Sequence, residues 1–132
     1  MTELLLDSNI LSHMMRQPEG AISKRARSEQ GRICTSIIVA AEIRYGLAKR
    51  PSEQLLHAAE TIFASIPVLP LEAPAELRYS ELRASIERAG TPISANDMWI
   101  AAHALALDCT LVTANERKFR RVPGLRVEIW LA

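Results

Sequence analysis

The sequence has few cysteines and no long apolar run, and both scarcities exclude classes of protein. Its two cysteines, Cys34 and Cys109, are far apart and lack the C-x-x-C spacing of zinc and redox sites, so we expect two buried, reduced thiols. The longest uninterrupted apolar runs, 37–41 and 98–102, have five residues each, whereas a membrane-spanning helix needs about 20. The start of the chain, residues 1–6, lacks the basic region and longer apolar stretch of a secretory signal. We therefore expect a cytoplasmic protein without a membrane span.

Paired histidines and a strong net charge are also missing. His13, His57 and His103 form neither an H-x-x-x-H nor an H-E-x-x-H pair, which argues against a histidine-ligated zinc site. Sixteen Lys and Arg against fifteen Asp and Glu give a formal net charge of +1, so the whole molecule does not attract nucleic acid as a strongly basic domain does. A polyanion would have to bind a local patch. The candidate patch, which also fits a solvated surface, contains Arg117, Lys118, Arg120 and Arg121.

Short apolar runs alternate with amphipathic segments along the chain. Each apolar run ends at polar, Pro or Gly residues, which predicts strands at 3–6, 32–35, 110–113 and 126–129 and an edge segment at 68–69 between two prolines. Helices are predicted at 8–16, 19–29, 37–48, 52–64, 74–89 and 94–107, with a helical turn at 115–119. This alternation predicts an α/β domain over residues 1–132, with a parallel-rich sheet covered on both faces and ligands beyond the carboxyl ends of the strands.

Three carboxylates from distant segments are candidate site residues. Asp7 directly follows the first predicted strand, although an Asp there is also a good helix N-cap. Glu42 lies among apolar residues of a predicted helix, where an unpaired charge is costly unless the side chain faces solvent. Asp97 begins the last long helix, where S-x-x-D also has the form of a capping box. If the three converge, they form the oxygen-ligand site that Mg²⁺ or Mn²⁺ prefers.

Four segments together resemble a known family. Residues 5–10 (LLDSNI), 35–46 (TSI through AEIRYG) and 90–97 (GTPI through ND) resemble, in order and spacing, a PIN-domain ribonuclease. The closing stretch 111–125, with LVTAN, Phe119 and VPGL, is similar to the VapC toxin branch of that family. Four motifs in the right order cover nearly the whole chain. The resemblance implies a three-layer α/β/α sandwich around a mostly parallel sheet.

The resemblance also implies an activity and its residues. It implies a metal-dependent endoribonuclease of a toxin–antitoxin pair, which cleaves structured RNA such as tRNA or rRNA and is neutralised by a VapB-type antitoxin. The family's acids fall on Asp7, Glu42 and Asp97, and a fourth family Asp falls on Asn115, which weakens the case for a second ion; Glu116 is a weak substitute for it. Ser8 and Thr113 are expected to orient a carboxylate or a bound water. The resemblance further implies a homodimer, for which Ile10, Leu11, Met14 and Met15 offer either a self-complementary surface or ordinary core.

The chemistry that these residues suit is hydrolysis assisted by Mg²⁺, with Mn²⁺ as the alternative ion. Asp7 and Asp97 are expected to bind the ion, and Glu42 either to bind it or to orient or deprotonate the attacking water. The basic run after Asn115 is expected to hold RNA, with Phe119 packed inward as an anchor. Two other functions stay open: phosphoryl transfer to Asp7, for which Asn9 stands where a second acid is needed, and a catalytically silent RNA- or protein-binding module, which Asn115 keeps open.

Overall fold

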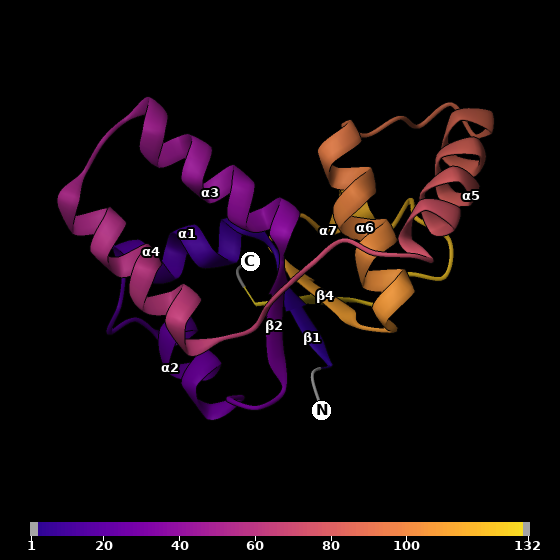
Figure 1. Ribbon diagram of the computed structural model, residues 1–132. Coiled ribbons are helices and arrows are strands. Elements are labelled where there is room, and N and C mark those ends of the chain that lie inside the picture. The colour runs from indigo at the N-terminus through magenta and orange to yellow at the C-terminus, as the bar shows by residue number, and fades with distance from the viewer. Residues whose placement is uncertain (1–2, 131–132) are drawn as a thin grey trace.

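Strands and helices alternate along the chain in the computed structural model, which describes residues 3–130 (Figure 1). Residues 1–2 and 131–132, the two ends of the predicted domain, lie outside the described residues. Each predicted element is confirmed to within two residues of its expected bounds. The elements are β1 (Leu4–Leu6), α1 (Ser8–Arg16), α2 (Ala21–Ser28), β2 (Ile33–Ser36), α3 (Ile37–Lys49), α4 (Glu53–Ser65), β3 (Val68–Leu69), α5 (Ala75–Arg88), α6 (Ala95–Leu107), β4 (Thr110–Thr113), α7 (Glu116–Phe119) and β5 (Val127–Ile129).

The sheet is parallel throughout its described strands and has the order β3-β2-β1-β4-β5. The first strand of the chain lies at its centre, where Leu5 pairs with Cys34 of β2 on one side and Leu111 of β4 on the other. These strands are apolar on both faces because helices cover both faces of a parallel sheet. The short β3 lies at the edge, as its flanking prolines predict.

Helices form a layer on each side of the sheet. Figure 1 shows α1 to α4 on one side and α5 and α6 on the other, which confirms the α/β/α sandwich. The most buried helix is α6, whose Ile100 and Ala101 have no exposed surface. The four apolar residues of α1, for which a dimer surface was the alternative, are buried at 8% exposure or less. Both cysteines are buried as well. Within residues 3–130 no helix has the length and apolarity needed to cross a membrane.

A buried polar pair joins the two helical layers. Ser36 ends β2 and caps α3 by accepting a hydrogen bond from Ile38 N (3.0 Å). Its Oγ also lies 2.7 Å from Nδ1 of His103 in α6, and both side chains are buried. Burial lowers the pKa of His103, which keeps the imidazole neutral, so the Ser36 hydroxyl and Nδ1 share a hydrogen bond between uncharged groups. The pair therefore links the helix that carries Glu42 to the helix that carries Asp97.

Ser36→Ala is expected to destabilise the chain more than Ser52→Ala does. Both serines are N-caps, of α3 and α4 respectively. Only Ser36 is fully buried and shared with a histidine, so its loss also leaves the His103 ring without this partner. Urea unfolding should give a loss of about 1–3 kcal/mol for Ser36→Ala and about 1 kcal/mol or less for Ser52→Ala. Equal losses would contradict a special role for the buried pair.

Candidate active site

Asp7 stands at the carboxyl end of the central strand. The strand pairing extends to it, since its backbone N–H donates to Val112 O (2.9 Å). Its side chain is buried at 2% exposure. Oδ1 accepts a hydrogen bond from Ser8 N (2.8 Å), and Oδ2 accepts one from the Thr113 hydroxyl (2.7 Å). Asp7 is thus the N-cap of α1, as the capping interpretation expects, and it is also held in one orientation by β4.

Thr113 and Asn9 form a hydrogen-bonded frame around Asp7. The Thr113 hydroxyl donates to Asp7 and accepts from Asn9 Nδ2 (3.3 Å) and from Asn115 N (3.1 Å). The side-chain oxygen of Asn9, Oδ1, in turn accepts from Ala114 N (3.2 Å). Asn9 was missed as a positioning residue in the sequence, where its only signal is the polar run that follows the first strand. The frame uses the hydrogen-bonding capacity of both side chains to fix the Asp7 carboxylate.

Glu42 projects from α3 as a half-buried carboxylate. Burial raises its pKa, and repulsion from Asp7 and Asp97 adds to that, while hydrogen bonding from the Ser8 and Asn96 side chains partly offsets both effects. Its Oε1 is buried without a hydrogen-bond partner among residues 3–130. An orphaned carboxylate oxygen between like charges is costly. This atom therefore has a vacant acceptor site that suits a cation or a water.

Asp97 lies in the first turn of α6 and has two partners. Ser94, the N-cap, accepts from Asp97 N (3.2 Å), as the S-x-x-D pattern predicts, and donates its hydroxyl to Asp97 Oδ2 (2.7 Å). The ammonium of Lys118 also lies 2.9 Å from Oδ2, and both side chains are largely buried. Lys118, expected from the sequence to bind RNA, therefore supplies positive charge to the acids.

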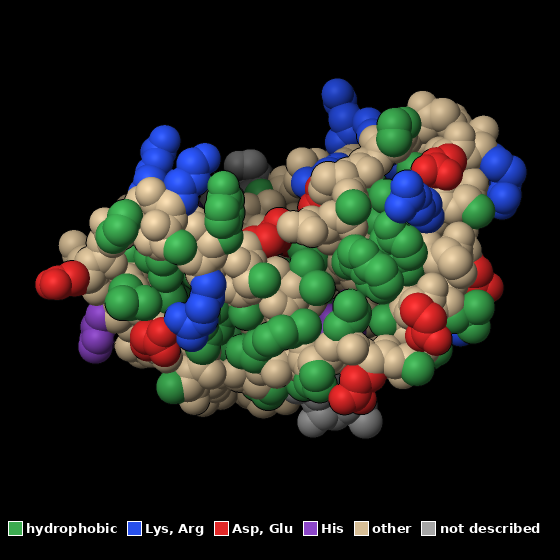
Figure 2. All heavy atoms as spheres, turned by 45° about the horizontal axis from the view of Figure 1, so that its top comes forward, with side chains coloured by type: hydrophobic (Ala, Val, Ile, Leu, Met, Phe, Trp, Pro, Cys, Tyr) green, Lys and Arg blue, Asp and Glu red, His purple; other side chains and the backbone are tan. Residues whose placement is uncertain are grey.

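The three acids act on one another electrostatically across the end of the sheet. Burial raises the pKa of Asp7, hydrogen bonds from Thr113 and Ser8 lower it, and the charges of Asp97 and Lys118 raise and lower it respectively. Figure 2 shows a cleft in this face of the molecule, with acidic side chains on its floor and Lys and Arg side chains on both sides. Among residues 3–130, no group of three or more His, Cys, Asp or Glu side chains is arranged to hold a metal ion. The all-oxygen donor set and the orphaned Oε1 nevertheless fit a hard divalent cation.

The other residues singled out in the sequence lie around β4 and α7. Asn115 is the N-cap of α7 and accepts from Lys118 N (3.2 Å). Glu116 pairs with Arg120, so the side chain weighed as a substitute for a fourth acid is bonded to a cation. Phe119 is fully buried, which confirms the predicted anchor. In the basic run, Arg117 and Arg121 are exposed, and Arg121 donates to Pro92 O (3.3 Å).

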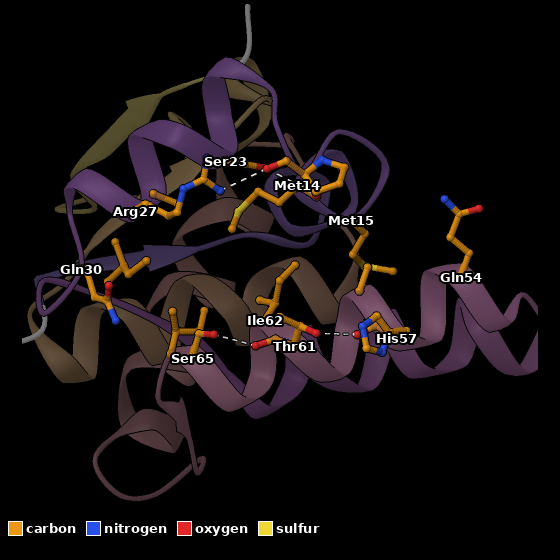
Figure 3. Close-up of a pocket in the computed structure, with 15 residues that line it drawn as sticks. Met14, Met15, Ser23, Arg27, Gln30, Gln54, His57, Thr61, Ile62 and Ser65 are labelled. Carbon is orange, nitrogen blue, oxygen red and sulfur yellow. Dashed lines mark hydrogen bonds between the residues drawn. The ribbon is translucent and has the colours of Figure 1, made fainter.

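A second hollow lies away from the acids. It is a groove of about 550 Å³ between α1 and α2 on one side and α4 on the other. Figure 3 shows Met14 and Met15 facing Ile62 and Thr61 of α4 across it, with Arg27 at the rim. Methionine side chains adapt to varied apolar partners. The groove was not predicted, because it depends on how the helices pack.

Asp7→Asn is expected to stabilise the metal-free chain at pH 7 and to lose that advantage in acid. The pKa of Asp7 is raised in the folded chain, so its ionisation costs stability at neutral pH. Below the ordinary value of 3.8 the carboxyl is protonated in both states and costs nothing. Asn retains the N-cap. Thermal unfolding in EDTA at a series of pH values measures this, with Asp108→Asn, a surface acid paired with Arg126, as control. A lower midpoint at pH 7 would mean that the charge of Asp7 stabilises the fold.

Comparison with known proteins adds to this geometry. The family model of the PIN domain matches residues 4–125. The chain is 34% identical over 131 residues to the tRNA(fMet)-specific endonuclease VapC of Shigella flexneri, covering 98% of this chain and 99% of that protein. It is 33% identical to ribonuclease VapC2 of Rickettsia felis, with 96% of each chain covered. Among solved structures, DNA-bound VapBC from Salmonella typhimurium superposes with a TM-score of 0.92 at 32% identity, over 98% of this chain and 99% of that one. The chain belongs to the PIN domain family, among its VapC ribonucleases.

Proposed function

We propose that this chain is a metal-dependent endoribonuclease that acts as the toxin of a toxin–antitoxin pair. The observation that carries the proposal is the group of three mutually repelling carboxylates, Asp7, Glu42 and Asp97, at the carboxyl end of the sheet. Relatives that cover nearly the whole chain are named as a tRNA(fMet)-specific endonuclease and a ribonuclease. A chain with this ancestry and this charge arrangement is best explained as a nuclease that needs a cation.

A tRNA is the substrate that we propose first. Two relatives, from Shigella flexneri and Salmonella typhimurium, are named tRNA(fMet)-specific endonucleases and are 34% and 32% identical to this chain. Cleavage of rRNA is the alternative within structured RNA. We propose the cytoplasm, where tRNA is found, as the compartment of this activity.

The proposed cofactor is Mg²⁺, with Mn²⁺ able to replace it. Asp7 and Asp97 would hold the ion, and Glu42 would either join them or act through water. When bound, such an ion polarises a phosphodiester and lowers the pKa of a coordinated water. Hard oxygen ligands and substrate phosphate are its usual partners, and they match the donors in this cleft.

The chain's own residues prepare the site in three ways. Thr113 and Asn9 fix the direction of the Asp7 carboxylate. Lys118 neutralises Asp97 through the contact at 2.9 Å. The raised pKa of Glu42 makes its Oε1 a better proton acceptor than an ordinary carboxylate, so it can orient the attacking water and take its proton. We assign Arg117 and Arg121, which are exposed and within three residues of Lys118 in the chain, to contacts with RNA phosphates.

Cleavage of tRNA is expected only with added Mg²⁺ or Mn²⁺. Asp97→Asn should lower the rate by at least about 100-fold, because it removes a charged ligand. The control is Asp108→Asn, whose carboxylate is exposed and paired with Arg126, and it should cleave normally. As a second readout, Mg²⁺ should raise the melting temperature of the parent and of Asp108→Asn but not that of Asp97→Asn.

Two results would contradict this proposal in different ways. Undiminished cutting in excess EDTA would overturn the metal mechanism. Binding of tRNA without any cleavage by the parent would favour the catalytically silent module. That alternative stays open because Asn115 stands where the family has an acid.

We propose a VapB-type antitoxin as the partner, and a homodimer as the toxin's own assembly. Solved relatives at 30% and 32% identity are described as VapBC bound to DNA. The groove beside Met14, Met15 and Ile62 suits the apolar face of a partner segment. The acids suit a cationic side chain, most simply Arg, because Asp97 already accepts an ammonium from Lys118. Antitoxin and RNA should therefore compete for the cleft.

Thr61→Arg is expected to abolish neutralisation by the antitoxin encoded beside this chain. Thr61 is exposed on α4 and lines the groove, so a long cation fills the groove without disturbing the core. Co-expression and gel filtration should show loss of the complex, while RNA cleavage by the purified toxin is unchanged. Leu56→Arg, on the same helix outside the groove, should leave the complex intact. A stable complex with Thr61→Arg would show that the groove is not part of the antitoxin interface.

A further inference from the structure

Tyr45 differs from the other aromatic residues of the chain. Trp, Tyr and Phe occur twice each, and five of the six have a place in the packing. Phe119 and Trp130 are buried, Phe63 packs against the core, and Tyr79 stacks on Trp99 with ring centroids 3.9 Å apart. Tyr45 is 66% exposed, more than any other large hydrophobic residue of the described chain. Packing therefore does not explain it.

The position of Tyr45 on α3 places it beside the proposed active site. Residues 42, 45 and 49 are three and four apart, so Glu42, Tyr45 and Lys49 share one side of the helix. Arg44 points the other way, since its guanidinium bonds to Glu60 of α4 (2.6 Å). The side that carries Glu42 faces Ser8 and Asn96, that is, the cleft. Tyr45 thus stands about one turn beyond the acid on the cleft side.

Two neighbours of Tyr45 suit a nucleic acid strand. The Lys49 ammonium lies 5.9 Å from the centroid of the Tyr45 ring, which joins a phosphate-binding charge to an aromatic surface. Gly46, one turn after Glu42, is a helix glycine beside which an added Cβ would meet nothing within 4 Å. Glycine inside a helix is less favourable than alanine, and here no packing requires it. Its bare backbone instead leaves room for a chain that approaches α3 closely.

We propose that Tyr45 stacks on an unpaired base of the RNA strand in the cleft, that Lys49 contacts a neighbouring phosphate, and that Gly46 lets the strand approach Glu42. This inference rests on the proposed ribonuclease function. An aromatic ring next to a cation is how proteins hold single-stranded nucleic acid without reading its sequence. A protein partner is less well matched, because the Lys49 ammonium lies near the ring and the Glu42 carboxylate stands about one turn away.

The test is RNA binding measured by fluorescence anisotropy, using a labelled hairpin with a single-stranded loop, in EDTA and across a series of KCl concentrations. Tyr45→Ala and Tyr45→Leu should bind about tenfold more weakly, and Tyr45→Phe and Tyr45→Trp should stay within about twofold of the parent, because stacking needs a ring. The salt dependence of the Tyr45 variants should equal that of the parent. Lys49→Ala should instead flatten the slope of log affinity against log salt by about 0.7.

Two further variants separate this role from effects on folding. Gly46→Ala should raise the melting temperature yet weaken RNA binding, because a methyl group improves the helix and blocks the strand. Leu77→Ala, at a residue of α5 that is 49% exposed, is the matched control and should bind RNA like the parent. Failure of the parent itself to bind RNA would count against the ribonuclease function. Parental affinity in Tyr45→Ala would overturn the present inference alone, and weaker antitoxin binding in that variant would assign the ring to a protein contact.

Discussion

The hydrogen bond from the Thr113 hydroxyl to the Asp7 carboxylate ties the end of the central strand, β1, to the end of its neighbour β4. Its partners are brought together by the parallel pairing of β1 with β4, in which Leu6 lies opposite Val112. Because β2 pairs with the other edge of β1, α3 begins beside the same point and carries Glu42 towards it. The helix α6, which runs back into β4, brings Asp97. The site is therefore a consequence of one central strand with a neighbour on each side.

Gathering acids at this point costs stability, and the chain offsets only part of that cost. Lys118 neutralises Asp97 and lowers the pKa of Asp7, but burial still raises the pKa of Asp7 and Glu42 above their ordinary values. A buried charge that lacks a full set of hydrogen-bond and ion-pair partners destabilises the fold, and a purely structural site has no need to keep one. Here it persists beside an orphaned Glu42 oxygen. Such a balance suits a site that is completed by something it binds.

The fold was predictable from the sequence because its signals are local. Leu4–Leu6 forms a strand that is buried on both faces, the prolines around Val68 exclude a central strand, and Ser36 and Ser94 cap helices. The identity of the three acids was also within reach. The way in which they are held was not, because Asn9 reaches Thr113 across 104 positions and Lys118 reaches Asp97 only once α7 is packed. Such contacts, like the groove between α1 and α4, depend on tertiary packing that no local pattern encodes.

The helix α3 shows how one element serves stability and chemistry on different sides. Val39 and Ile43 bury one face in the core, and Arg44 bonds to α4. The face towards the cleft carries a half-buried acid, a bare glycine and an exposed ring, each of which weakens the helix or leaves apolar surface in water. These three departures from good packing adjoin one another and lie on the side where Glu42 faces the other acids. A helix selected only for stability would have filled that face, so its openness is best explained by a strand that must lie along it.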